Sequence, residues 1–217
     1  MTAPMAHIAP HPFYLRDDYI EASAWEGTLR SASGHKLLVL PEELIIGVHR
    51  ATEHETGKAL PLIMTGCGRQ WGERLVRRWE QEWTHFYGHA LADADFTAFE
   101  TWLRLLFEHQ GWGHLELEFG LEDEGLLEFR LRRSVFARLL ADSPFDTVCH
   151  IFAGLLAAMT SRFAETELDA IEIACERSGA PCCRFIVAVP ERVESARALA
   201  LDGASSEQLL AELRKPR

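Results

Sequence analysis

The sequence predicts an α+β domain in which an antiparallel sheet packs with helices. Segments with the apolar period of a helix occur in the first half, and two pairs of strand-like segments follow in the second. Helices and strands come in blocks instead of alternating strictly, which argues against a parallel sheet. With 217 residues, 47% of them hydrophobic, the chain can form one substantial core, so we expect one main domain.

The first segment, residues 1–34, is predicted to be an N-terminal arm that packs on another surface, for which a partner subunit is one candidate. It contains three early prolines and scattered aromatic residues: Phe13, Tyr14, Tyr19 and Trp25. Residues 35–113 are expected to form a helical part with a possible role in dimerisation, and residues 114–217 a ligand-binding part.

In the helical part, a short strand at 35–40 is followed by predicted helices at 42–55, 68–87 and 95–109. The middle helix carries an aromatic stripe at intervals of four: Trp71, Leu75, Trp79 and Trp83. These residues share one helix face, which suits the core, a dimer seam or the wall of a ligand site.

The pattern then changes to alternation of apolar and polar residues at 115–119 and 127–131, which predicts an antiparallel hairpin. Two helices are expected next, at 134–140 with Ser134 as cap and at 149–163 with Thr147 as cap. A second strand pair at 170–175 and 183–189 ends before Pro190, and a last helix at 205–215 opens with a capping box at Ser205.

The charge excludes some classes of function. A net charge of −11 repels a phosphate backbone, so we do not expect nucleic-acid binding. No apolar run is long enough to cross a bilayer and no signal peptide is recognisable, so we expect a cytoplasmic protein without a membrane partner. In a reducing compartment the five cysteines favour free thiols or metal ligation over disulfides.

Four residues of the second half form a candidate zinc site: Cys149, Glu172, Cys175 and Cys183. Zinc accepts thiolate sulfur together with carboxylate oxygen, and four protein ligands leave no position for a reacting water, so such a site is structural. Glu172 and Cys175 are an odd number of residues apart, so both can face one ion only if their strand twists or ends between them. The alternative is a set of ordinary buried thiols and a surface carboxylate.

The segment 134–187 resembles the 4-vinyl-reductase-like, hydrocarbon-binding domain family. It has the family's pattern of a cysteine at a helix start, a glycine in that helix, a Glu and Cys three apart, a turn glycine and a final cysteine before an aromatic: Cys149, Gly154, Glu172, Cys175, Gly179, Cys183 and Phe185. The zinc-containing sensory domains of phenol- and toluene-responsive activators are similar in this segment. The resemblance implies the fold of nitric-oxide-sensing haem domains and vesicle-tethering subunits, usually dimeric, with a buried apolar pocket beside the zinc.

Two departures from that family bear on the site. Cys182 duplicates the last cysteine, and we favour Cys183 as the ligand because of its spacing of eight from Cys175. The phenol sensors have a tryptophan on the strand before the position of Ser134, where this chain has none, which argues against phenol as the ligand. The candidate pocket residues, which would equally suit a filled core, are Trp102, Leu106, Phe129, Leu131, Phe152 and Leu156.

The expected function is that of a stand-alone, homodimeric sensor or carrier that binds a hydrophobic or aromatic small molecule and signals through a protein partner. The alternative is an accessory protein or vinyl reductase of tetrapyrrole (bacteriochlorophyll or haem) biosynthesis, and a pure scaffold is a third possibility. The sequence offers no phosphate-binding loop and no Ser-His-Asp order, so no motif in it favours an enzyme, although the vinyl reductase stays open as an alternative. A histidine pair, His85 and His89, is the weaker metal candidate.

Overall fold

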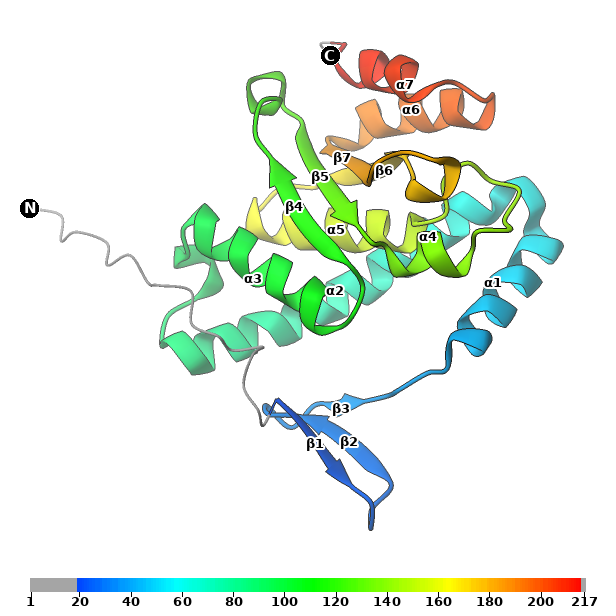
Figure 1. The fold of residues 1–217 in the computed structure, drawn as a ribbon. Helices are drawn as coiled ribbons and strands as arrows, with labels where there is room; N and C mark the ends of the chain where they lie inside the picture. The colour runs from blue at the N-terminus through cyan, green and yellow to red at the C-terminus, as the bar shows by residue number, and fades with distance from the viewer. Residues whose placement is uncertain (1–18, 216–217) are drawn as a thin grey trace, which may run out of the picture.

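A four-stranded antiparallel sheet lies at the centre of the computed structural model, which describes residues 19–215 (Figure 1). Its strands are β4 (His114–Glu118), β5 (Leu127–Arg132), β6 (Asp169–Ala174) and β7 (Cys183–Ala188). The spatial order is β4-β5-β7-β6, so the two hairpins predicted from the sequence join through the pairing of β5 with β7. The predicted α+β class is confirmed.

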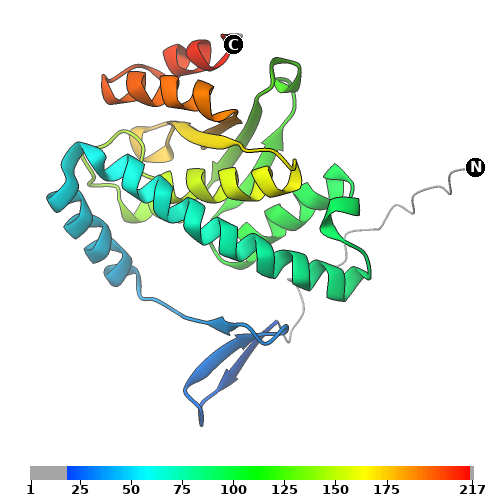
Figure 2. The ribbon, with the colours of Figure 1, turned by 180° about the vertical axis from the view of Figure 1, so that it is seen from behind.

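Helices cover both faces of this sheet (Figures 1 and 2). The helices are α1 (Glu42–Thr56), α2 (Leu60–Tyr87), α3 (Phe96–His109), α4 (Val135–Leu139), α5 (His150–Phe163), α6 (Pro190–Leu201) and α7 (Ser206–Leu213). α3 and α5 pack on one face, with α2 lying along the outside of α5, whereas α6 and α7 pack on the other. Short 3-10 turns lie at Gly57–Ala59, Leu91–Asp93, Glu122–Glu124 and Glu176–Ser178.

The sheet separates two apolar clusters because successive side chains of a strand point to opposite faces. Phe129 and Phe185 belong to the larger cluster, with the aromatic residues of α2, α3 and α5. Ile171 and Ile186 point the other way, to Val193 of α6 and to α7. The larger cluster contains both helical and sheet residues, so the helical part and the part after residue 113 share one core.

α2 and α5 lie side by side (Figure 2), and their backbones approach closely at glycines. A Cβ atom on Gly68 would lie 2.0 Å from the carbonyl oxygen of Ile151, and one on Gly154 would lie 2.0 Å from that of Thr65. Real Cβ atoms do not approach an oxygen so closely, so only glycine permits this helix separation. Leu75, Trp79 and Trp83 of the predicted stripe lie further along α2, where they are buried and belong to the core.

The N-terminal region contains a second antiparallel sheet, which was not predicted within the arm. It consists of β1 (Ile20–Ser23), β2 (Thr28–Ser31) and β3 (Lys36–Leu37), and the strand expected at 35–40 has only two residues. Tyr19 is buried, whereas the indole of Trp25 is 98% exposed at the hairpin tip. Phe13 and Tyr14 lie outside the described residues.

One helix start and one helix cap were wrong, and one helix, α6, was not predicted. α2 begins at Leu60, before the predicted Gly68, and Pro190 opens α6 instead of ending a pattern, because proline fits the first turn of a helix, where its missing N–H is not needed. Thr147 does not cap α5: the N-cap is Cys149, whose N–H bonds to Glu172. The predicted caps Ser134 and Ser205 are confirmed, the latter with its full capping box. In the described range, no helix is both long and apolar enough to cross a membrane.

Candidate metal centre

The structure brings the four candidate ligands together from three elements. Cys149 is the N-cap of α5, Glu172 lies in β6, Cys175 follows the end of β6, and Cys183 is the first residue of β7. The ligand atoms of all four residues lie within 4.8 Å of one another, and all four residues are buried. The cluster therefore joins the start of a core helix to both strands of one hairpin.

A bulge in β6 lets Glu172 and Cys175 face the same point. Glu172 pairs with Phe185 and Ala174 pairs with Arg184, so the register shifts by one residue between them. An extra residue in one strand bends it and reverses the alternation of side chains beyond that point. Because Glu172 and Cys175 are an odd number of residues apart, both can face one ion only if the strand twists or ends between them. The bulge and the end of β6 at Ala174 meet this requirement.

The three sulfur atoms are arranged at the spacing of metal ligands. Cys183 Sγ lies 3.6 Å from both Cys149 Sγ and Cys175 Sγ, and the latter two are 4.0 Å apart. A Zn–S bond of about 2.3 Å gives a tetrahedron with an edge of about 3.8 Å. A disulfide requires a sulfur separation of about 2.05 Å, so these thiols are not paired with one another.

Burial sets the electrostatics of the cluster. It raises the pKa of Cys149 and of Glu172 well above their ordinary values, because charged forms lose water in the interior. Hydrogen bonds from the Cys149 and Cys183 thiols hold the pKa of Cys175 at about 2, so one thiolate is favoured. Four acidic groups at this depth ionise together only beside a compensating cation, which is the chemistry of a metal site.

Neighbouring groups hold the ligands in place. One oxygen of Glu172, Oε2, accepts a hydrogen bond of 2.7 Å from the backbone N–H of Cys149, while Oε1 has no hydrogen-bond partner and is free to bind an ion. The Ser134 hydroxyl lies 3.1 Å from Cys149 Sγ. The Glu176 carboxylate accepts from the backbone N–H groups of Arg133 and Ser134, which ties the turn after Cys175 to the start of α4. These contacts preorganise the cluster.

We expect Ser134→Ala to weaken metal binding by about 10- to 100-fold, because a hydrogen-bonding neighbour of a ligand sulfur is lost. Zinc affinity is measured by competition with a chromogenic chelator. Ser205→Ala is the matched control, since it removes an equivalent helix cap at α7 and leaves the cluster untouched. Equal zinc affinities for Ser134→Ala and the native chain would contradict this role.

Other residues weighed from the sequence take different positions. Cys182 is buried, but it is not part of the cluster, and burial raises the pKa of its thiol. His85 and His89 do not share a helix face, because α2 ends at Tyr87. His150, which follows Cys149, is buried with no hydrogen-bond partner at Nε2, and desolvation lowers its pKa to about 4.

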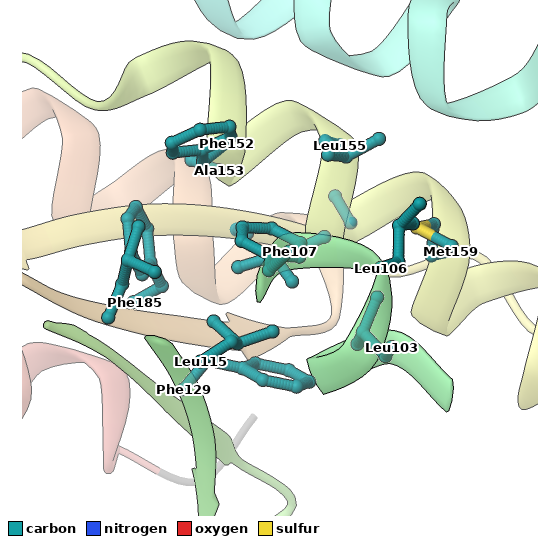
Figure 3. Packing of buried hydrophobic residues seen from close by; sticks show 14 of the residues in the cluster. Leu103, Leu106, Phe107, Leu115, Phe129, Phe152, Ala153, Leu155, Met159 and Phe185 are labelled. Atoms are coloured by element: carbon teal, nitrogen blue, oxygen red, sulfur yellow. The ribbon is translucent and has the colours of Figure 1, made fainter. Parts of the chain in front are cut away.

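The six predicted pocket residues all lie in the larger apolar cluster and are buried. Figure 3 shows part of this packing, in which Phe152 of α5, Leu106 of α3 and Phe129 of β5 belong to one cluster of buried side chains. Hollows of about 200 and 560 Å³ on the described surface are lined by other residues. Nothing in the sequence indicated one polar atom in this cluster, the indole Nε1 of Trp79. It is fully buried and has no hydrogen-bond partner. The ring of Trp79 stacks on that of Trp102, with centroids 4.8 Å apart.

No family model and no curated protein matches the sequence. Among solved structures, the phenol-responsive sensory domain of the transcription activator PoxR, with phenol, matches with 17% identity and a TM-score of 0.64, covering 92% of this chain and 93% of that one. Lower scores are found for a trafficking protein particle complex subunit 3 from Naegleria fowleri covalently bound to palmitic acid (13% identity, 68% and 93% covered, TM-score 0.48). A vinyl-4-reductase family protein from Methanocaldococcus jannaschii also matches (14% identity, 70% and 82% covered, TM-score 0.43). Over nearly its whole length, this chain has the fold of the PoxR sensory domain.

Proposed function

We propose that this chain is a sensor or carrier domain that binds a hydrophobic, aromatic small molecule and that a structural zinc ion stabilises its C-terminal hairpin. Cys149, Glu172, Cys175 and Cys183 would hold the ion. Three thiolates and a carboxylate suit zinc, and the spacing of the sulfur atoms fits its tetrahedral preference. With four protein ligands the ion has no open position, so its role is to tie α5 to the β6–β7 hairpin and not to catalyse a reaction.

The observation that carries the ligand proposal is the buried, unpaired indole N–H of Trp79 inside an aromatic cluster. A buried donor without a partner costs about 1–3 kcal/mol, and an oxygen atom of a ligand would recover that cost. The six predicted residues, Trp102, Leu106, Phe129, Leu131, Phe152 and Leu156, would supply the apolar wall. The PoxR domain, whose fold this chain shares, was solved with phenol, which supports a small aromatic ligand. This chain lacks the strand tryptophan of the phenol sensors, so phenol serves as a probe with a hydroxyl group, for which the Trp79 N–H would be the donor.

A homodimer would use the N-terminal region, because large apolar side chains are exposed there. They are Ile20, Trp25, Leu38, Val39, Leu40, Leu44 and Val48. A group of exposed apolar residues of this kind marks an interaction surface. We propose that a second copy covers it, that the protein acts in the cytoplasm, where the ligand thiols stay reduced, and that the signal passes to a partner protein.

The test is a Trp79→Phe variant, which keeps an aromatic ring and removes the N–H. We expect phenol affinity to fall about tenfold, the value of one hydrogen bond, while toluene affinity is unchanged, since toluene has no oxygen to accept that bond. Tryptophan fluorescence titration measures both, and native mass spectrometry of the untreated protein reports zinc and dimer. Binding of haem with neither aromatic compound would favour the tetrapyrrole alternative, and binding of none of the three would leave a scaffold.

A further inference from the structure

A second polar site lies away from the cysteine cluster, in a hollow of about 200 Å³ between α1 and the loop that joins α4 to α5. Its lining residues are His49, Arg50, Glu53, Leu140, Asp142 and Ser143. His49 and Glu53 are one helical turn apart in α1, so their side chains lie on the same face of that helix. None of these residues takes part in the proposed function.

The unusual feature of this hollow is the state of His49. Its side chain is 3% exposed, yet neither Nδ1 nor Nε2 has a hydrogen-bond partner. Buried polar groups in folded proteins are almost always satisfied, so a group that no protein atom satisfies points to a bound ion or molecule. The nearest ionic group is the Glu53 carboxylate, whose Oε2 lies 3.7 Å from His49 Nδ1, beyond hydrogen-bond distance.

The charges around the hollow favour a cation. Glu53 and Asp142 carry two negative charges, and Arg50 supplies one positive charge, which an ion pair of 3.3 Å directs to Asp142 at the exposed rim. Glu53 also accepts a hydrogen bond from the Ser143 hydroxyl, which orients its carboxylate. Burial lowers the pKa of His49, so its imidazole is neutral at physiological pH, the form that binds metals.

We propose that His49 and Glu53 bind a divalent transition-metal ion, with solvent molecules completing its coordination. Imidazole nitrogen and carboxylate oxygen are ligands for zinc, cobalt and nickel. Adjacent nitrogen and oxygen ligands of a tetrahedral zinc lie about 3.3 Å apart, so small side-chain rotations bring the two donors into bonding geometry. Unlike the cysteine cluster, this site opens to solvent at its rim, where the side chain of Asp142 is 86% exposed, so we expect its ion to exchange with solvent.

The experiment is a cobalt titration of the untagged chain after its first equivalent of zinc has been bound. We expect one further equivalent of cobalt, with weak visible absorption and without the intense near-ultraviolet band of thiolate ligation. Glu53→Gln and His49→Asn should each fail to bind the equivalent of cobalt and should keep the first equivalent, which is zinc. His54→Asn is the matched control, because His54 is an exposed histidine of the same helix and does not line the hollow.

Uptake of a single metal equivalent by the native chain would overturn the proposal, as would a second equivalent that Glu53→Gln retains. Glu53 is partly exposed, so its substitution decides the question even if His49→Asn disturbs the fold. The first equivalent is zinc, and mass spectrometry counts it separately from the added cobalt. Failure of this second site is therefore distinguishable from failure of the zinc cluster or of aromatic binding.

Discussion

Replacing Cys183 by serine is expected to release the proposed zinc ion and to destabilise the β6–β7 hairpin by several kcal/mol, because metal binding is coupled to folding. Cys183 is the first residue of β7, which pairs with both β5 and β6. Loss of the metal at this point should therefore destabilise both hairpins. Two thiolates and a carboxylate would remain, buried without the charge that compensates them. Metal content by mass spectrometry and the melting temperature are the two measurements.

The neighbouring cysteine provides the control for this prediction. Cys182→Ser makes the same chemical change one residue earlier, outside the donor cluster, and should keep one zinc per chain and lose little stability. A chelator should lower the melting temperature of the native chain and of Cys182→Ser, and leave that of Cys183→Ser unchanged. If both serine variants retained zinc and melted alike, the assignment of Cys183 as a ligand would be wrong.

Replacing Gly154 by alanine will destabilise the fold by about 3 kcal/mol or more, at the upper end of the cost of overpacking. The new Cβ atom would lie 2.0 Å from the carbonyl oxygen of Thr65 and 2.6 Å from the backbone nitrogen of Arg69. Backbone atoms cannot rotate away as side chains do, so α5 must separate from α2 along their shared length. Urea unfolding followed by circular dichroism measures the change.

Gly66→Ala is the matched control for this helix contact. Gly66 lies in α2, as the partners of Gly154 do, but a Cβ atom there meets nothing within 4 Å. Alanine is the better helix former, so this variant should gain up to about 1 kcal/mol. A Gly154→Ala chain as stable as Gly66→Ala would show that the two helices do not approach as closely as described.

Much of the C-terminal half was predictable because its signals are local. Apolar and polar residues alternate along 115–119 and 127–131, and these segments form β4 and β5. The set Cys149, Glu172, Cys175 and Cys183 was identified from residue type and spacing, and the structure places the four together. The preference for Cys183 over Cys182 as the fourth ligand agrees with the geometry. Side chains alternate along a strand, so only one of two adjacent cysteines faces the cluster.

The remaining features depend on tertiary contacts, which the periodicity of apolar residues in the sequence does not report. β1, β2 and β3 are too short for alternation to show, and they are held by pairing with one another. The start of α2 at Leu60 was missed because Gly66 and Gly68 weaken the helical signal, although Gly68 is what lets α5 approach. The hollow at His49 joins residue types common on surfaces from positions about ninety residues apart, so only the folded chain reveals it.

The glycine contact between α2 and α5 also has a mechanical consequence. At Gly68 and Gly154 no side chain separates the two backbones, so we expect the two helices to move together as one stiff lever. One end of this lever holds Cys149, and α2 continues backwards into α1 and the exposed N-terminal sheet. A molecule that wedges the aromatic cluster open would turn the lever as a whole, so we expect occupancy of the interior to be felt at the distant surface where another subunit would dock.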